Sequence, residues 1–194
     1  MELKHVALVI ADIGGYTRFI TFHKTALLHA QEIISQLLET IVEHAVFPLT
    51  LNKLEGDAAL MYADMGDEQT IAARDVAGQV MAFFSAFHAK SRELSGSRAN
   101  CPCDACQHIL DLKLKAVLHH GVVAIKKIRQ FEELTGEDVI LAHRLLKNGV
   151  SKAEYILMTA SFHHLAGDLP GYRGEKGKES YADLGVVDTV VFSS

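Results

Sequence analysis

The stretch Ala11-Asp12-Ile13-Gly14-Gly15-Tyr16-Thr17 links a short apolar run, residues 6–10, to a long helical pattern. A carboxylate at the end of a strand offers the hard oxygen ligands that Mg²⁺ prefers. Gly14 and Gly15 allow the backbone to approach a ligand closely, and the N–H groups that open a helix attract anions. The stretch therefore predicts a site for a metal-bound phosphate, with an ordinary turn as the alternative.

A second carboxylate lies at the tip of a predicted hairpin. The segment Lys53-Leu54-Glu55-Gly56-Asp57 separates two β-like apolar runs, residues 46–51 and 58–63, a pattern typical of a hairpin. Asp57 could then stand beside Asp12 and bind the same cation. A solvated turn whose charges face water is the alternative interpretation.

Together these segments resemble the class III nucleotidyl cyclases, the catalytic domains of adenylate and guanylate cyclases. That family has Asp-Ile-x-Gly-Phe-Thr after its first strand and a Lys-x-x-Gly-Asp hairpin, which residues 12–17 and 53–57 match. Its third segment, Gly-x-x-Val-Asn-x-Ala-x-Arg-Leu, is matched in part by residues 136–145. The three segments occur in the family's order and span the chain from about Leu3 to Leu146.

The order of predicted elements indicates an α+β fold with a mixed, mostly antiparallel sheet and helices packed on one face. The resemblance implies that this fold is the ferredoxin-like core of the cyclases. Residues 1–194 are expected to form one domain with a Cys-rich insertion at about 95–108. Apolar periodicity predicts helices over residues 25–46, 69–91, 136–147 and 160–166. Strands are predicted at residues 109–119, 122–128 (after a turn at Gly121), 155–159, 181–182 and 186–192, and a loop at 171–178.

The resemblance also implies roles for residues of the first two segments. Asp12 and Asp57 would hold two Mg²⁺ or Mn²⁺ ions, assisted by the carbonyl group of Ile13. The phosphates of a purine nucleoside triphosphate would lie against the backbone of four consecutive residues: Gly14, Gly15, Tyr16 and Thr17.

The base and the transition state would involve other residues, and the family works as a head-to-tail dimer. Lys53 from the second subunit would read the purine edge, with Glu133 in place of the family's Asp. Arg144 matches the arginine that neutralises the phosphate in the transition state, a task that suits a guanidinium. The family's Asn is replaced by Ile140, which cannot hydrogen-bond a ribose.

Two hypotheses of different class follow from this pattern. One is a divergent cyclase that closes a purine nucleoside triphosphate, slowly, into a 3′,5′-cyclic nucleotide with release of pyrophosphate. The other is an inactive, dimeric nucleotide-binding or interaction module with a cysteine-bound zinc. The two aspartates and Arg144 favour the first hypothesis; Ile140 and the cysteines favour the second.

All three cysteines lie within six residues, at Cys101, Cys103 and Cys106. Thiolates are good zinc ligands, and dense cysteines in a reducing compartment indicate a metal more than a disulfide. The fourth ligand could be His108, His119, His120 or a group from another subunit, and a loop of free thiols is the alternative. The remaining histidines considered are interpreted as structural: His5, His23, His29, His44 and His88.

Composition limits the partners. A net charge of −5 argues against a general nucleic-acid or anionic-membrane surface. No apolar run approaches the roughly 18 residues needed to span a bilayer, and the N-terminal residues lack the features of a signal peptide. We therefore expect a cytoplasmic protein whose partners are a purine nucleotide and a second copy of itself.

Overall fold

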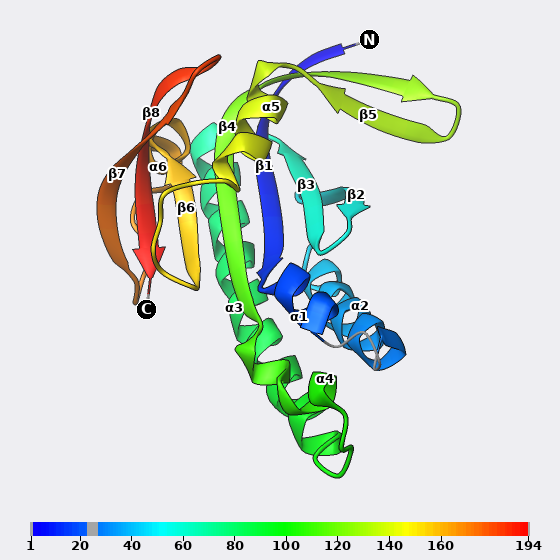
Figure 1. Cartoon of the computed structure of the whole chain (residues 1–194). Helices are drawn as coiled ribbons and strands as arrows, with labels where there is room; N and C mark the ends of the chain where they lie inside the picture. The colour runs from blue at the N-terminus through cyan, green and yellow to red at the C-terminus, as the bar shows by residue number, and fades with distance from the viewer. Residues whose placement is uncertain (1, 23–26, 194) are drawn as a thin grey trace.

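The fold is built on one eight-stranded sheet, described here from a computed structural model that covers residues 2–22 and 27–193. The strand order is β2-β3-β1-β4-β6-β8-β7, and β5 pairs with β4 outside this path. Every pairing is antiparallel except that of β4 with β6. The predicted α+β fold with a mixed, mostly antiparallel sheet is thereby confirmed (Figure 1).

The elements follow one another along the chain in the order predicted for the main motifs. The strands are β1 (Glu2–Gly14), β2 (Thr50–Glu55), β3 (Ala58–Asp64), β4 (Lys113–Ile128), β5 (Phe131–Thr135), β6 (Tyr155–Thr159), β7 (Arg173–Tyr181) and β8 (Gly185–Ser193). The helices are α1 (Tyr16–Phe22), α2 (Leu27–Glu43), α3 (Gln69–Ser97), α4 (Asp104–Gln107), a 3₁₀ turn η2 (Ile109–Asp111), α5 (Glu137–Leu145) and α6 (Ala160–Ala166).

Strand β1 lies between β3 and β4 in the interior of the sheet. Its residues 6–11 are buried, on both faces, which explains their continuous apolar sequence. Ala7, Val9 and Ala11 point into the main core with residues of α2, α3 and α6. Val6, Leu8 and Ile10 alternate with them and pack with residues of α5 on the opposite face. The larger helices thus cover one face, and the short α5 covers part of the other.

The register of β1 brings its end against the tip of the β2–β3 hairpin. Asp12 is paired with Ala58 of β3 on one side and with Lys115 of β4 on the other. The backbone N–H of Ile13 also donates to the carbonyl oxygen of Asp57, at 3.0 Å. Gly15 then adopts a φ of +93°, which glycine permits, and α1 begins at the next residue.

The prediction of a hairpin at Gly121 is wrong, because β4 runs straight through this position to Ile128. The chain turns after it, where Arg129 has a φ of +58°. Gly121 is instead a site of close approach: a Cβ there would lie 2.1 Å from Cγ of Asp138 on α5. The Asp138 carboxylate accepts hydrogen bonds from the Val122 N–H and the His119 ring.

Other predicted boundaries also differ from the structure. The strand predicted from residue 109 begins at Lys113, because residues 109–111 form the 3₁₀ turn η2, in which Ile109 is buried. Helix α3 continues to Ser97 instead of ending at Ser91, because Ser91 and Leu94 are both buried on its inner side. Residues 173–178, expected in a loop, belong to β7, which pairs along its whole length with β8. Its alternation of exposed and half-buried residues is typical of an edge strand. Of the helices in the described residues, none combines the length and apolar character needed to cross a bilayer.

Candidate nucleotide and metal sites

The two predicted metal-binding aspartates lie together at the end of the sheet. Burial raises the pKa of Asp12 to about 6, and the negative charge of Asp57 adds to the effect. Burial also raises the pKa of Asp57. Two half-buried carboxylates that disfavour each other's ionisation form a place where a cation is attracted. Carboxylate oxygens are donors that Mg²⁺ and Mn²⁺ prefer.

Lys115 is a third charged residue in this group, and the sequence motifs did not include it. It is paired with Asp12 across the β1–β4 ladder, and its charge opposes the rise in pKa of both carboxyl groups. Its ammonium group lies 5.9 Å from the centre of the Tyr155 ring. The sequence did show lysines alternating along the predicted strand. It could not show that Lys115 lies beside Asp12, because that contact depends on the register between β1 and β4.

The predicted phosphate-binding residues follow the aspartates directly. Gly14 ends β1, and Gly15 leads into α1, whose first two residues are Tyr16 and Thr17. The Tyr16 side chain is half-buried and packs against the main core, whereas Thr17 is exposed. A Cβ on Gly14 would lie 2.9 Å from the Lys115 side chain, so the absence of a side chain there lets Lys115 extend along β1.

The predicted base-reading residues form a second group on β2 and β5. The Lys53 ammonium lies 3.3 Å from the Glu55 carboxylate and 4.0 Å from that of Glu133. Glu55 is in turn 3.4 Å from Nδ1 of His143 on α5. The structure therefore brings Lys53 and Glu133 together, although they are distant in the sequence, and connects them to the helix that carries Arg144.

Helix α5 presents the remaining predicted residues to solvent. The Ile140 side chain is 55% exposed, and Arg144 lies in the last turn of the helix. The charge of Arg144 partly offsets the burial that raises the pKa of Tyr181. Among the described residues, no hydrogen bond or ion pair joins the side chains of Lys53, Glu133 and Arg144 to Asp12 or Asp57.

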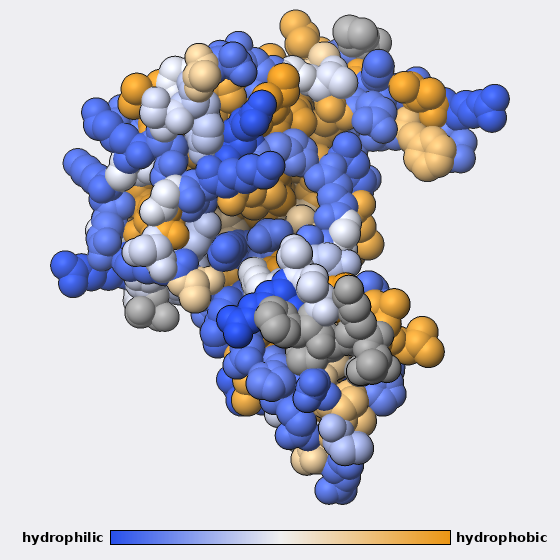
Figure 2. Space-filling model, in the orientation of Figure 1, coloured by the Kyte–Doolittle hydropathy of each residue, from blue (hydrophilic) through white to orange (hydrophobic). Residues whose placement is uncertain are grey.

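The face of the sheet that carries α5 is left partly open by the helices (Figure 1). Figure 2 shows this face hollowed between the projecting β4–β5 hairpin and the end of the molecule that carries α1. Hydrophobic residues gather in the hollow, and hydrophilic residues line its edges.

The three cysteines meet a histidine that the sequence interpretation set aside. Nδ1 of His29, at the start of α2, lies 3.3 Å from Sγ of Cys103, 3.6 Å from that of Cys101 and 3.7 Å from that of Cys106. The four ligand atoms all lie within 4.8 Å of one another, so the cluster could hold a metal ion. The structure therefore places His29, interpreted from the sequence as structural, among the candidate metal ligands.

The other candidates for the fourth ligand have partners elsewhere. His108 lies 2.8 Å from the Asp111 carboxylate, and the buried His119 contacts Asp138 and Thr159. His120 stacks on His5. His23 lies outside the described residues. The spacing of the cysteines indicated a metal, but no sequence pattern pointed to a ligand more than seventy positions earlier.

The thiols themselves differ in acidity. Hydrogen bonds with the backbone N–H and the side chain of Cys103 lower the pKa of Cys101 to about 7. Burial raises the pKa of Cys106 to about 11. Metal binding requires thiolates, so occupancy of such a cluster releases protons and strengthens as the pH rises.

Comparison with solved structures identifies the fold as that of class III adenylyl and guanylyl cyclase catalytic domains. The adenylyl cyclase CyaB from Pseudomonas aeruginosa has a TM-score of 0.74 and 17% sequence identity, covering 100% of this chain and 95% of that one. The guanylate cyclase domain of RhGC from Catenaria anguillulae, solved in complex with GTP, has a TM-score of 0.63 and 14% identity, covering 100% and 99%.

By sequence, the chain belongs to the family described as "Protein of unknown function (DUF2652)", whose model matches residues 34–155. It is also 36% identical, over 126 residues, to the uncharacterized protein Rv2561/Rv2562 of Mycobacterium tuberculosis. That match covers 65% of this chain and 57% of the relative.

Proposed function

We propose that this chain is a divergent cyclase-like domain that binds a purine nucleoside triphosphate together with Mg²⁺ or Mn²⁺. The observation that carries the proposal is the adjacency of Asp12 and Asp57 at the end of β1, inside a cyclase fold. Burial makes this pair costly to ionise without a cation, and a divalent ion would remove that cost.

Each residue has a place in this proposal. Asp12 and Asp57, with the Ile13 carbonyl, would hold two Mg²⁺ or Mn²⁺ ions, which supply positive charge beside the phosphates. The backbone from Gly14 to Thr17 would contact the phosphate oxygens. In addition, zinc is the ion that we propose for Cys101, Cys103 and Cys106, because thiolates favour it over hard cations.

A complete site would need two copies of the chain. Lys53 and Glu133 lie together, as base recognition requires, but no ion pair or hydrogen bond links them to the aspartates within the described part of one chain. In a head-to-tail homodimer, Lys53 and Glu133 of one subunit would complete the site around Asp12 and Asp57 of the other. Such a closed, two-fold arrangement is common for homo-oligomers.

The reaction open to such a site is cyclisation. The 3′-hydroxyl of the ribose would lose its proton to solvent and its oxygen would attack the α-phosphorus, as the bond from that phosphorus to the pyrophosphate oxygen breaks. Arg144 would stabilise the charge that develops on the phosphate oxygens. Ile140 cannot supply the polar contact to the ribose, so we expect slow turnover.

Calorimetric titration with ATP and GTP tests the binding proposal. Binding is expected with Mg²⁺ or Mn²⁺ and is expected to disappear in a chelator and in Asp12→Asn. Asp64→Asn is a matched control, because Asp64 ends β3 in an exposed ion pair with Lys4. Nucleotide binding that survives unchanged in chelator and in Asp12→Asn would show that the acidic pair is no metal site.

A second candidate function is an inactive, dimeric nucleotide-binding or interaction module. The observation that favours it is Ile140, which is exposed on α5 at the position of the family's ribose-binding Asn. An assay of cyclic nucleotide formation with Mn²⁺ separates the two candidates. Metal-dependent nucleotide binding without any cyclic product, even after long incubation, would identify the inactive module.

A further inference from the structure

The Cys/His cluster, defined as His29, Cys101, Cys103 and Cys106, has the geometry of a complete metal site. In a tetrahedral zinc site, the usual Zn–S and Zn–N distances separate two sulfurs by about 3.8 Å and a sulfur from a nitrogen by about 3.6 Å. Here the sulfurs of Cys101 and Cys103 are 3.5 Å apart. The three nitrogen–sulfur distances are 3.3, 3.6 and 3.7 Å. One ion at the centre would reach all four atoms.

The residues around the cluster suit an ion held by three thiolates. Such a centre carries a net negative charge, and the guanidinium of Arg98 lies beside the Cys106 sulfur. Arg98 is itself fixed by an ion pair of 2.8 Å with Glu32 on α2. The Gln107 side chain donates to the Cys101 carbonyl at 2.8 Å, which holds the loop between the cysteines. Supporting contacts of this kind orient metal ligands.

A disulfide explains the cluster less well. All three cysteines are free, and the sulfurs of Cys101 and Cys103 are 3.5 Å apart, well beyond the bonding distance of about 2.05 Å. A disulfide would also leave the third cysteine and the imidazole without a role. The imidazole nitrogen is within 3.7 Å of all three sulfurs, which is the arrangement of ligands around a shared centre.

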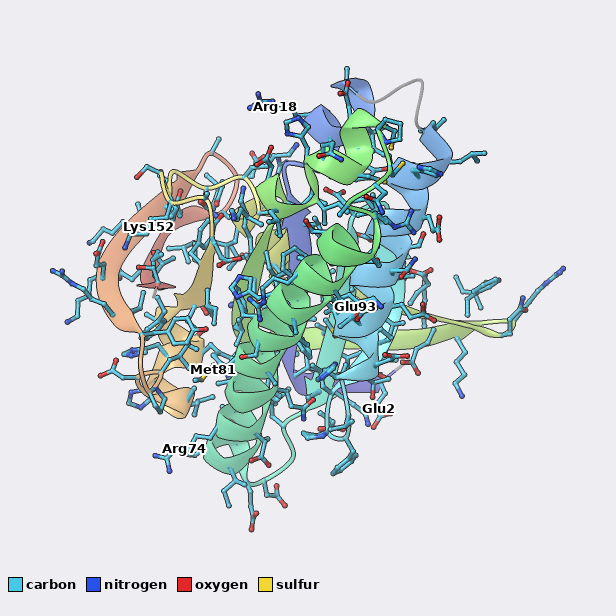
Figure 3. The ribbon with its side chains drawn as sticks, turned by 90° about the horizontal axis from the view of Figure 1, so that it is seen from below. Glu2, Arg18, Arg74, Met81, Glu93 and Lys152 are labelled. Carbon is cyan, nitrogen blue, oxygen red and sulfur yellow. The ribbon has the colours of Figure 1, made fainter. Side chains whose placement is uncertain are left out.

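An ion in the Cys/His cluster would connect α2 to the segment that follows α3. His29 lies at the start of α2, and the cysteines lie between α3 and η2, on the segment that includes α4. Figure 3 shows α1 with Arg18, α4 and the start of α2 gathered at the same end of the molecule. The segment after Cys103 also contributes Asp104 and Asp111 to the lining of a cavity of about 530 Å³ that Gly15 and Arg18 line from the other side.

We propose that His29, Cys101, Cys103 and Cys106 form a closed structural zinc site, and that this site fixes one wall of the cavity next to the predicted phosphate-binding loop. With four protein ligands, the ion has no position for substrate, which is typical of structural and not catalytic zinc. The zinc site itself stands apart from the proposed nucleotide function. Only its effect on the phosphate end of the site rests on that function.

The first experiment measures metal in protein purified without added metal. We expect about one zinc per chain, and cobalt substitution should give the absorption bands of a tetrahedral thiolate site. His29→Ala should weaken zinc binding by at least about a hundredfold, more than is typical for loss of a supporting contact. His29→Cys should restore it, because a Cys₄ set also binds zinc.

The matched control is His108→Ala, because His108 is the nearest histidine in sequence to the cysteines and lines the same cavity. It should leave zinc content and affinity unchanged. Wild-type protein without zinc or another thiophilic metal would overturn the site. Loss of zinc in His108→Ala, or unchanged affinity in His29→Ala, would overturn the assignment of His29. Circular dichroism of each variant separates these outcomes from unfolding.

The second experiment tests the connection to the cavity without relying on nucleotide. Hydrogen exchange of the backbone amides at residues 104–112 and 15–19 is compared before and after zinc removal by a chelator. Faster exchange in both segments is expected, and unchanged exchange at residues 15–19 would overturn the link to the phosphate loop. If nucleotide never binds but zinc and the exchange effect are present, the proposed function fails and the zinc site stands.

Discussion

The two proposed metal sites differ in how their ligands behave when no ion is bound. Asp12 and Asp57 are carboxylates whose burial and proximity oppose ionisation, as the raised pKa of Asp12, about 6, shows. The thiols of the Cys/His cluster are neutral when protonated and can remain packed beside the core, where Cys106 is buried. Loss of the ion therefore leaves a repelling pair in the first site, whereas protonation leaves neutral side chains in the second at any pH below the pKa of Cys101, about 7.

The difference in ligand chemistry also separates the tasks of the two sites. Oxygen ligands on two or three protein groups leave coordination positions for phosphate oxygens and water, as Mg²⁺ commonly requires. Three thiolates and an imidazole fill the coordination of zinc and exclude substrate. The first arrangement suits chemistry on a nucleotide, and the second suits holding α2 to the segment after α3.

The largest expected effect is on stability when the thiols are removed. The combined substitution Cys101→Ser, Cys103→Ser and Cys106→Ser should abolish zinc binding. With free zinc a thousandfold above its Kd, an ion that binds only the folded chain contributes about 4 kcal/mol to the free energy of unfolding. Urea unfolding with and without a chelator measures this contribution.

The chelator should destabilise the wild type and leave the triple variant unchanged. The variant is expected to fold, because Ala105 and Ile109 pack this segment into the main core independently of any ion. Equal sensitivity of both proteins to the chelator would remove the structural role from the Cys/His cluster.

The next effect concerns the rate, and it tests the site around the acidic pair. Ile140→Asn restores a polar side chain where the cyclases have one. One well-placed donor that acts in the transition state contributes about 3 kcal/mol, or roughly a hundredfold in rate. We therefore expect Ile140→Asn to form cyclic nucleotide about a hundredfold faster than the wild type with Mn²⁺.

Ile140→Ala is the companion variant, because it relieves crowding of the sugar without adding a hydrogen-bonding group. An increase in Ile140→Asn alone assigns the effect to the polar contact. A wild type that already turns over as fast as Ile140→Asn would contradict the argument from Ile140.

The residues of the two sites also differ in how well the sequence predicts them. Asp12 and Asp57 follow short motifs whose order along the chain indicates the fold, and the structure places them together. Lys53 and Glu133 were likewise matched by position in the family pattern. His29 was missed, because its relation to the cysteines arises only when α2 packs against α3 and α4.

Local patterns also failed where tertiary contacts decided the outcome. Gly121 suggests a turn in isolation, but its missing side chain makes room for the Asp138 carboxylate against a continuous strand. The polar residues 173–178 suggest a loop, but pairing with β8 makes them a strand. Lys115 lies beside both aspartates only because of the β1–β4 register.

A smaller effect is expected in the pH dependence of stability of the metal-free protein. The folded-state pKa of Asp12, about 6, exceeds the ordinary value of 3.8, so the folded chain holds this proton more tightly than the unfolded chain. Stability should therefore fall as the pH rises from about 4 to about 6 and stay low above that window. The shift corresponds to about 2 to 3 kcal/mol.

Asp12→Asn removes the free-energy cost of ionising a buried carboxyl group. It should therefore stabilise the metal-free protein at pH 7.5 and have little effect near pH 3.5. Thermal unfolding in a chelator at several pH values measures the difference. Lys115→Met should increase the free-energy cost of ionising Asp12 and Asp57, because the charge of Lys115 lowers the pKa of both aspartates. If Asp12→Asn destabilises the metal-free protein at pH 7.5, the two carboxylates are not in the repelling arrangement described here.

The smallest expected effect tests whether the acidic pair of one subunit meets Lys53 of the other. Asp12→Asn and Lys53→Ala chains should each be nearly inactive as homodimers. When they are mixed in equal amounts and exchange freely, half of the dimers are mixed, and one of the two sites in each mixed dimer is intact. Activity should recover to about a quarter of the unsubstituted protein, as two-fold symmetry requires. The assay uses Mn²⁺ and the Ile140→Asn background, where turnover is expected to be measurable, and light scattering confirms the dimer.

The control is a mixture of Asp12→Asn and Asp57→Asn chains. Both substitutions damage the half of the site that one subunit contributes, so no mixed dimer of these two chains contains an intact site. A mixture that is no more active than its components would place all the site residues within one chain.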